Sequence, residues 1–185
     1  AGPMIKRNAK EPQDMTMQQL LWQGTEKLNR SSVPDAGLDA RYLLLEAFGE
    51  SLASFLAIKD KTLPEDEETF LKCRKYEEMI DRRAERIPLQ HLTGVQEFMG
   101  FEFYVNEHVL IPRQDTETLV ELVLQEQKGK DAALLDVCTG SGCIAISLAL
   151  MGGFRDVTAL DVSREALMVA ARNAQRLLKE HEGDL

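Results

Sequence analysis

A strand, a glycine turn and a helix follow one another directly between residues 132 and 150, and they constrain the fold more than any other part of the chain. Apolar residues 132–135 predict a buried strand closed by Asp136, and Cys138–Gly142 predict a tight turn. The apolar pattern of residues 144–150 predicts a helix packed on a sheet. Such a turn leaves several N–H groups unpaired at the helix start, where they bind a polar or anionic ligand group. Glycine permits the positive φ values and the close approach of that ligand.

A second strand, predicted from residues 156–160, also ends in an acid, Asp161. Asp161 follows Gly142 by 19 positions. Nucleotide-binding βαβ units place an acid about 20 residues beyond the glycine turn, where it accepts hydrogen bonds from ribose hydroxyls. Together these features favour a ligand of the adenosine type. The alternative is an ordinary βαβ turn with a capping aspartate.

Composition excludes several other classes of protein. Of the 185 residues 44% are apolar, and no apolar run approaches the 18 or more residues of a membrane span. Residues 1–94 carry 14 basic and 16 acidic side chains, and residues 95–185 carry 8 and 15. No basic stripe exists to neutralise a phosphate backbone. We therefore expect a protein substrate, with no direct nucleic-acid contact and no membrane association.

The start of the chain and its thiols indicate the compartment. Residues 1–7 lack the apolar core of a signal peptide, and Ala1–Pro3 before Met4 resembles the remnant of an expression tag. The odd number and scatter of the cysteines predict free thiols in a reducing cytoplasm. Neither they nor the dispersed histidines have the spacing of a metal site, so no metal is expected. The cysteines are Cys73, Cys138 and Cys143.

Residues 14–87 are predicted to form helices, because their apolar side chains recur at helical spacing. Asp14 is expected to cap the first helix, and residues 31–35 to separate it from the second. Gly49 is expected to end the second helix and Ser51 to cap a short third one.

A fourth helix is predicted to begin at Pro64 and to run to about Arg86. The acids of residues 65–68 suit the positive end of its dipole, with a metal site or a basic partner as the alternative. Trp22 and Tyr42 are expected in the core or at a domain contact rather than stacked on bases. The apolar side of the fourth helix is expected to comprise Phe70, Leu71, Cys73, Tyr76, Met79 and Ile80.

The periodicity then changes from 3.6 to near 2. This change predicts a hairpin of residues 95–99 and 101–105 around Gly100. The next helix is expected to have Asp115 or Thr116 as its cap. Gly129 is expected to end this helix. Ser163 is expected to cap the last helix of the chain.

This order of parts resembles the HemK/PrmC family, the N5-glutamine methyltransferases that act on peptide chain release factors. Its specific parts are RIPLQHLTG at residues 86–94 and LIPRQDTE at residues 110–117. The glycine turn fits any class I methyltransferase. The resemblance implies an α/β protein, which consists of an all-α substrate-recognition bundle, a β-hairpin linker and the first half of a Rossmann-like class I methyltransferase domain. The corresponding residues are 14–87, 88–112 and 113–185, after a tail or tag remnant at 1–13.

The resemblance also implies S-adenosylmethionine as cofactor and the glutamine of a Gly-Gly-Gln motif in release factors as substrate. It places the turn at the methionine and ribose portion of the cofactor and Asp161 on the ribose hydroxyls. Thr116 and Glu117 resemble family residues beside the cofactor pocket, with helix capping as the alternative. A cytoplasmic monomer is expected. The cofactor-binding residues implied are Cys138, Thr139, Gly140, Ser141, Gly142, Asp161, Thr116 and Glu117.

Two departures from the family pattern matter. Cys138 stands where most methyltransferases have the first glycine of the turn. We expect a negative φ and a packing role for it, with a redox or nucleophilic role as the alternative. The family's Asn-Pro-Pro-Tyr motif, which holds the glutamine amide, does not occur in the 185 residues, so no catalytic residue is expected in this chain. We expect a piece of a longer enzyme that is inactive alone and has an exposed strand edge after residue 131.

Three other functions remain open. Another class I methyltransferase, with a small-molecule, rRNA or different protein substrate, would share the glycine turn. A non-enzymatic module would bind a partner through its helices. An NAD-dependent dehydrogenase fits the spaced acid but not the helical domain.

Overall fold

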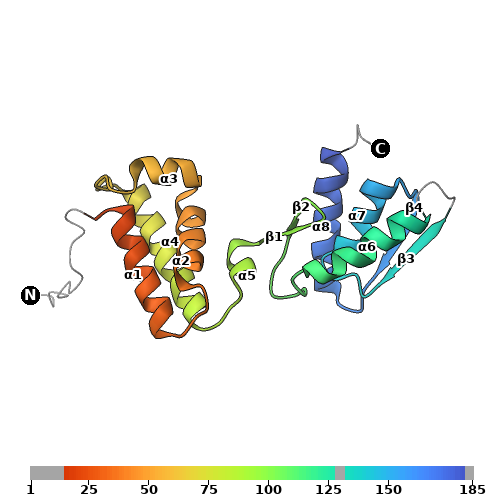
Figure 1. Ribbon diagram of the computed structural model, residues 1–185, viewed down its shortest axis with the longest axis horizontal. Helices are drawn as coiled ribbons and strands as arrows, with labels where there is room; N and C mark the ends of the chain where they lie inside the picture. The colour runs from red at the N-terminus through yellow and green to blue at the C-terminus, as the bar shows by residue number, and fades with distance from the viewer. Residues whose placement is uncertain (1–14, 128–131, 182–185) are drawn as a thin grey trace, which may run out of the picture. The chain divides into compact units, whose positions relative to one another are not determined.

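The chain divides into two compact units, Ala1–Leu89 and Gln90–Leu185. The computed structural model describes residues 15–127 and 132–181 (Figure 1). Among these residues, no helix combines the length and the apolar character needed to cross a membrane.

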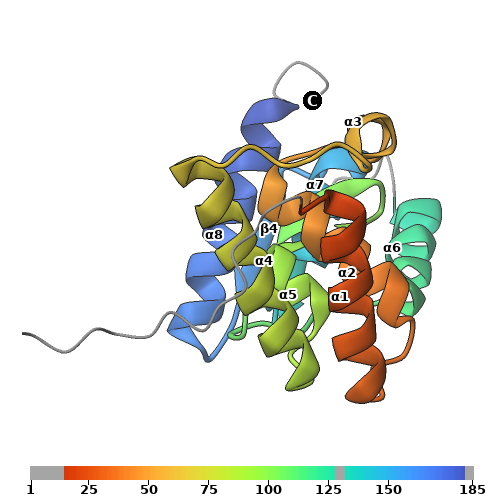
Figure 2. The ribbon, with the colours of Figure 1, turned by 90° about the vertical axis from the view of Figure 1, so that its left-hand side faces the viewer.

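The first unit is a bundle of helices, as the helical spacing predicts. Three of its helices lie alongside one another, and the short α3 lies across one end of them (Figures 1 and 2). Its core consists of side chains from all four helices, including Leu20, Leu43, Phe55 and Ile80. The helices are α1 (Met17–Arg30), α2 (Ala36–Phe48), α3 (Leu52–Ile58) and α4 (Glu67–Ala84).

The helix ends follow from local hydrogen bonding. Gly49 ends α2 with a φ of 69°, and the Ser51 hydroxyl caps α3 by accepting from the Ser54 N–H, so both predictions are confirmed. Thr16 caps α1 in a reciprocal capping box with Gln19. The predicted cap Asp14, the predicted stop Gly129 and the tail at 1–13 lie outside the described residues.

The start of α4 differs from the prediction. The helix begins at Glu67 rather than at Pro64, because the Asp66 carboxylate accepts the Thr69 N–H at 2.7 Å. This bond holds the pKa of Asp66 below its usual range. The acidic run therefore serves as a helix cap and first turn. In the described part of the chain, no group of His, Cys, Asp and Glu side chains has an arrangement that holds a metal ion.

Some apolar side chains that were expected in the core are exposed. On α4, Phe70 and Leu71 lie outside the buried face. The positions that share a helix face with the buried Tyr76 are three, four and seven residues before it, namely 73, 72 and 69. Trp22 and Tyr42 are 63% and 52% exposed, so the prediction of a core position is wrong for both. These side chains give the first unit an apolar and aromatic surface.

The second unit begins with the short helix α5 (Leu89–Thr93) and a hairpin of β1 (Val95–Phe98) and β2 (Phe101–Tyr104). The two strands are antiparallel. Met99 and Gly100 connect them with φ values of 53° and 79°, the positive pair that a two-residue hairpin turn requires. The predicted hairpin is confirmed.

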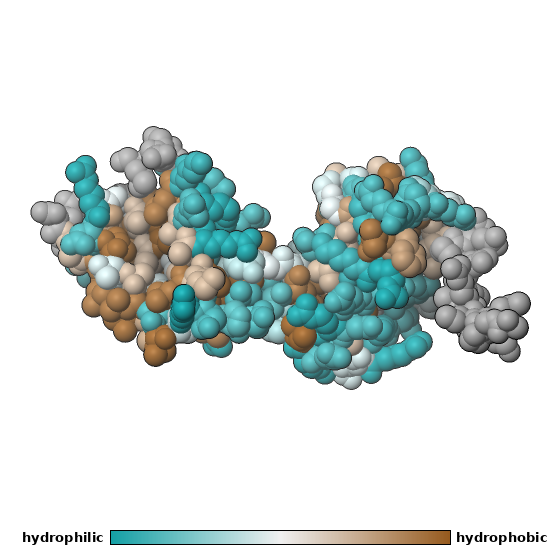
Figure 3. Space-filling model, turned by 180° about the vertical axis from the view of Figure 1, so that it is seen from behind, coloured by the Kyte–Doolittle hydropathy of each residue, from teal (hydrophilic) through white to brown (hydrophobic). Residues whose placement is uncertain are grey.

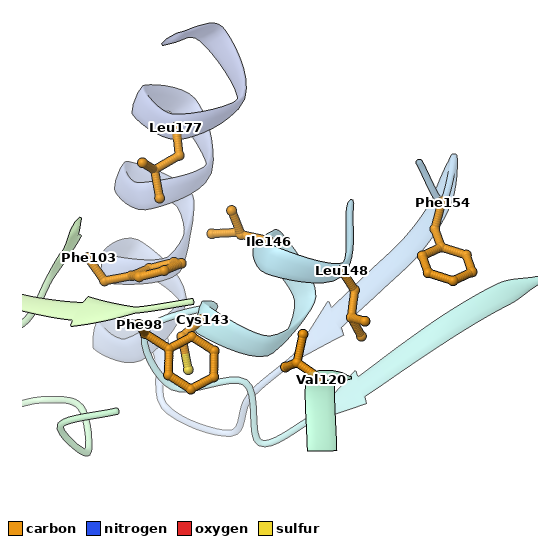
Figure 4. Close-up of a cluster of buried hydrophobic side chains, with 8 residues drawn as sticks. All are labelled: Phe98, Phe103, Val120, Cys143, Ile146, Leu148, Phe154 and Leu177. Atoms are coloured by element: carbon orange, nitrogen blue, oxygen red, sulfur yellow. The ribbon is translucent and has the colours of Figure 1, made fainter. Parts of the chain in front are cut away.

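A parallel pair of strands follows, joined by a helix as predicted. Strand β3 (Ala133–Val137) pairs with β4 (Asp156–Leu160), and α7 (Cys143–Gly152) connects them. Helices α6 (Gln114–Gln127) and α8 (Arg164–Glu180) complete the unit (Figure 1). Buried side chains from the hairpin, from the three helices and from the segment before β4 form its core (Figure 4): Phe98, Phe103, Val120, Cys143, Ile146, Leu148, Phe154 and Leu177.

The two parallel strands are buried on one face only. Leu134 and Val157 pack against the core, whereas Leu135, Val137 and Leu160 point away from it and are 62%, 62% and 49% exposed. Hydrophobic side chains accordingly gather over β3 and β4 in Figure 3. The strands are therefore buried on one face rather than on both, as the apolar runs alone would suggest, because the second face is exposed. With two strands in the described sheet, each has an unpaired edge, as expected.

We predict that Gly24→Ala destabilises the first unit by about 1–3 kcal/mol. A Cβ at Gly24 would lie 2.0 Å from the buried Tyr76 hydroxyl oxygen. The matched control is Gly37→Ala, whose Cβ would meet Thr25 Cγ2 at an ordinary 3.7 Å. It should be neutral or stabilise α2 by up to about 1 kcal/mol. Urea unfolding followed by circular dichroism measures both, and equal effects would contradict the packing of Gly24 on Tyr76.

Candidate cofactor site

The turn between β3 and α7 has three residues in the left-handed region of backbone space. Cys138, Gly140 and Gly142 have φ values of 64°, 56° and 81°. A glycine adopts these values without a steric penalty, whereas a residue with a Cβ pays about 1–2 kcal/mol. The turn therefore depends on its glycines and carries strain at Cys138.

Cys138 differs from the expectation in two respects. Its φ is positive rather than negative, and its thiol is exposed rather than packed. The position therefore keeps the backbone conformation of a glycine although the residue is a cysteine. Cys143, at the start of α7, is buried, and burial raises the pKa of its thiol, which makes it a poor nucleophile.

Thr139 fastens the turn to both strands. Its N–H donates to the Leu160 carbonyl at 2.9 Å, and its hydroxyl donates to Asp136 Oδ2 at 2.7 Å. Asp136 was expected to close the strand, but β3 continues for one more residue, to Val137. Within the turn, the Gly142 N–H donates to the Thr139 carbonyl at 2.9 Å.

Asp161 directly follows β4 and meets the turn, as its spacing predicts. Its Oδ2 accepts the Gly140 N–H and its Oδ1 accepts the Ser163 N–H, both at 2.9 Å. Hydrogen bonds from the Ser163 and Gly140 N–H groups hold the pKa of Asp161 below its usual value, so the carboxylate stays ionised. Each oxygen of an ionised carboxylate has two acceptor sites, which leaves capacity for a hydroxyl donor.

Part of the expected row of free donors in the turn is occupied. The N–H groups of Thr139, Gly140 and Gly142 are each bonded within the protein. A phosphate site needs such groups free, so these three do not form one. At Gly140 a Cβ would meet no atom within 4 Å, and the space beside the turn is open there. An open glycine surface next to an ionised acid fits a cofactor that has ribose hydroxyls and no phosphate.

Gly142 serves packing instead. A Cβ there would lie 2.9 Å from Ile146 Cδ1 and 3.2 Å from the Ala170 Cβ. Ile146 belongs to α7 and Ala170 to α8, so the missing side chain at Gly142 allows these helices to approach each other.

Thr116 and Glu117 lie in the first turn of α6, which begins at Gln114. Neither Thr116 nor Asp115 is therefore the cap of this helix. The Glu117 carboxylate accepts the Met99 N–H at 2.7 Å, which fastens the hairpin turn to α6. No described hydrogen bond or ion pair joins Thr116 or Glu117 to the glycine turn.

One residue that touches the turn was not among the predicted site residues. Asn173 is fully buried in α8 and donates to the Ser141 carbonyl at 2.9 Å. A signal was present in the sequence. The buried face of α8 contains one polar residue among apolar ones at helical spacing: Ala166, Val169, Ala170, Asn173 and Leu177.

Comparison with known proteins gives two family matches. Residues 19–94 match the PrmC N-terminal domain, and residues 114–181 match the ribosomal protein L11 methyltransferase (PrmA) model. A helical domain, a hairpin and part of an α/β methyltransferase region thus define the class of protein.

Several curated relatives resemble the chain over most of its length. A release factor glutamine methyltransferase of Leptospira interrogans is 39% identical over 88% of this chain and 56% of its own length. The enzyme of the same description from Koribacter versatilis is 39% identical over 88% and 57%. A bifunctional methyltransferase of Rickettsia conorii is 34% identical over 87% of this chain and 34% of its own length.

The chain belongs to the PrmC/HemK family. It spans a little over half the length of the release factor glutamine methyltransferases described above. The sequence resemblance to this family is thereby confirmed.

We predict that the two glycines of the turn respond differently to alanine. Gly140→Ala should cost about 1–2 kcal/mol, because it adds backbone strain in open space. Gly142→Ala should cost about 1–3 kcal/mol more, because its Cβ would also press against Ile146 and Ala170. Chemical unfolding of both variants measures the difference, and equal losses would contradict the assignment of Gly142 to helix packing.

Proposed function

We propose that this chain is part of an enzyme that transfers a methyl group from S-adenosylmethionine to the side-chain amide N5 of a glutamine. The proposed substrate is the Gly-Gly-Gln motif of peptide chain release factors. One observation carries the proposal: a PrmC-type helical domain precedes a glycine turn that is hydrogen-bonded to the acid at the end of the next strand. The names of the relatives agree with this substrate.

The cofactor proposal is supported by the chemistry of the turn. S-adenosylmethionine has a ribose and no phosphate, and when bound it supplies an electrophilic methyl group on a sulfonium sulfur. The ionised Asp161 is proposed to accept the ribose hydroxyls. Cys138–Gly142 are proposed to lie along the methionine and ribose portion, where the open side of Gly140 permits close approach.

Thr116 and Glu117 are proposed to lie beside the same pocket at the start of α6. Glu117 also holds the hairpin turn through Met99, so its contribution to the pocket is partly indirect. A change at Glu117 should disturb the hairpin and α6 together.

The target amide requires a second set of groups. An amide nitrogen is a poor nucleophile because its lone pair is delocalised, so the reaction depends on in-line alignment and on hydrogen bonds to the amide N–H groups. In the family, the Asn-Pro-Pro-Tyr motif provides these bonds, and this motif is absent from the 185 residues. The described residues are proposed to supply the cofactor half of the site.

The first unit is proposed to recognise the release factor. Its exposed apolar and aromatic side chains suit a protein partner, and it carries no basic excess for RNA. We place the enzyme in the cytoplasm, where release factors act, as a monomer.

Two alternatives meet specific observations. The PrmA match is the observation behind one alternative, a methyltransferase with a different protein substrate. This match covers the proposed cofactor region alone and not the helical domain. An NAD-dependent dehydrogenase fits the spaced acid but not the helical domain, which matches the PrmC N-terminal domain over residues 19–94.

We predict that Asp161→Asn weakens binding of S-adenosylhomocysteine by about 1–3 kcal/mol, because a charged hydrogen-bond acceptor is lost. Asp156→Asn, at the exposed opposite end of β4, is the matched control and should leave the affinity unchanged. Isothermal titration calorimetry measures both, with NADH as a control ligand. Unchanged affinity in a folded Asp161 variant, or preferential binding of NADH, would contradict the cofactor proposal.

The substrate has a separate test. A longer protein that contains this chain should transfer radiolabelled methyl from S-adenosylmethionine to a release factor, and not to a variant of it with Gly-Gly-Asn in place of Gly-Gly-Gln. The 185-residue chain alone should transfer none. Labelling that persists in the Gly-Gly-Asn factor would refute the proposed target.

A further inference from the structure

Asn173 is a polar side chain in the centre of α8 with 0% of its surface exposed. Its carboxamide uses both N–H groups and its carbonyl oxygen. The N–H groups donate to the carbonyls of Tyr104 and Ser141, each at 2.9 Å, and Oδ1 accepts the Tyr104 N–H at 2.8 Å. One neutral side chain therefore joins the end of β2 to the middle of the glycine turn.

The Ser141 carbonyl is where this connection acts on the turn. Ser141 lies between Gly140 and Gly142, whose lack of a Cβ gives the backbone its greatest freedom. The Gly142 N–H belongs to the same peptide unit as the Ser141 carbonyl and donates to Thr139. Hydrogen bonds on both sides fix the orientation of this peptide plane, and with it the surface that the turn presents to a ligand.

The other end of the connection is the backbone of Tyr104. Asn173 pairs with both polar groups of this residue, as a neighbouring strand would. Two more side chains of α8 hold the same strand. The Arg172 guanidinium lies 3.6 Å from the centre of the Tyr104 ring, and Arg176 donates to the Glu102 carbonyl. Among the described interactions of these three side chains, those of Asn173 alone reach the turn.

We propose that Asn173 is the positioning residue of the cofactor turn and couples that turn to the hairpin. The inference rests on the proposed cofactor and adds a residue that acts through the Ser141 carbonyl without touching the ligand. The role requires a neutral amide. An aspartate would place a carboxylate against two carbonyl oxygens, and a serine is too short to bridge them. A residue that only fills the core would affect stability and leave ligand affinity unchanged.

The test compares Asn173→Ser with Arg176→Gln. Both changes loosen the contact between α8 and β2, and only the first releases the turn. Asn173→Ser should weaken S-adenosylhomocysteine binding about tenfold, the equivalent of one lost buried hydrogen bond. In the ligand-free protein, the same substitution should also speed hydrogen exchange of the Gly140 and Gly142 N–H groups. Arg176→Gln should leave both readings at the wild-type level.

Two results would overturn the positioning role. One is a folded Asn173→Ser variant that is less stable but binds S-adenosylhomocysteine as the wild type does. The other is an equal effect of both variants on affinity and on exchange in the turn. If the wild type binds no S-adenosylhomocysteine, the cofactor proposal fails, and exchange of Gly140 and Gly142 in the ligand-free variants still decides the role of Asn173.

A measurement on the wild type keeps the proposal testable if Asn173→Ser does not fold. Because the Tyr104 N–H donates to Asn173, S-adenosylhomocysteine should slow its exchange together with that of Gly140. Slower exchange at Gly140 with no change at Tyr104 would refute the coupling between turn and hairpin.

Discussion

The hydrogen bond from the Gly140 N–H to the Asp161 carboxylate is the interaction on which the proposed cofactor site depends most. It joins the residue after β4 to the turn after β3, at the carboxyl end of the parallel pair, where open α/β sheets bind their ligands. The Thr139 N–H makes a second connection to the end of β4. These bonds are possible because glycine and cysteine residues of the turn adopt positive φ values. The conformation of the turn is thus set by hydrogen bonds within the protein.

The same bonds limit what the turn can bind. Three N–H groups of the turn are occupied, and an ionised carboxylate with acceptor capacity remains. An acceptor at this position favours a ligand with ribose hydroxyls, which agrees with membership of the PrmC/HemK family. The exposed apolar face of β3 and β4 agrees with a chain that spans only part of the length of its relatives. The structure of the turn and the family comparison therefore both support the proposal of an S-adenosylmethionine site.

Local signals predicted most of the fold. Gly49 and Ser51 mark helix ends through their own backbone or side chain, and the hairpin and the strand–turn–helix follow from short-range periodicity. The features that were not predicted depend on partners that are distant in sequence, or on which of several adjacent residues caps a helix. Glu117 bonds Met99, and Asn173 bonds Tyr104 and Ser141, which no local pattern reveals. The positive φ of Cys138 was missed because its residue type favours the opposite sign.

The central claim is that the turn and Asp161 together form the cofactor site. A ¹⁵N–¹H NMR titration of this chain with S-adenosylhomocysteine tests it most directly, since it locates binding residue by residue. If the turn and Asp161 bind the cofactor, the largest shifts should occur at Gly140, Ser141 and Val162, with small shifts in α1–α4. Shifts confined to other parts of the second unit, in a folded sample that binds the ligand, would contradict it.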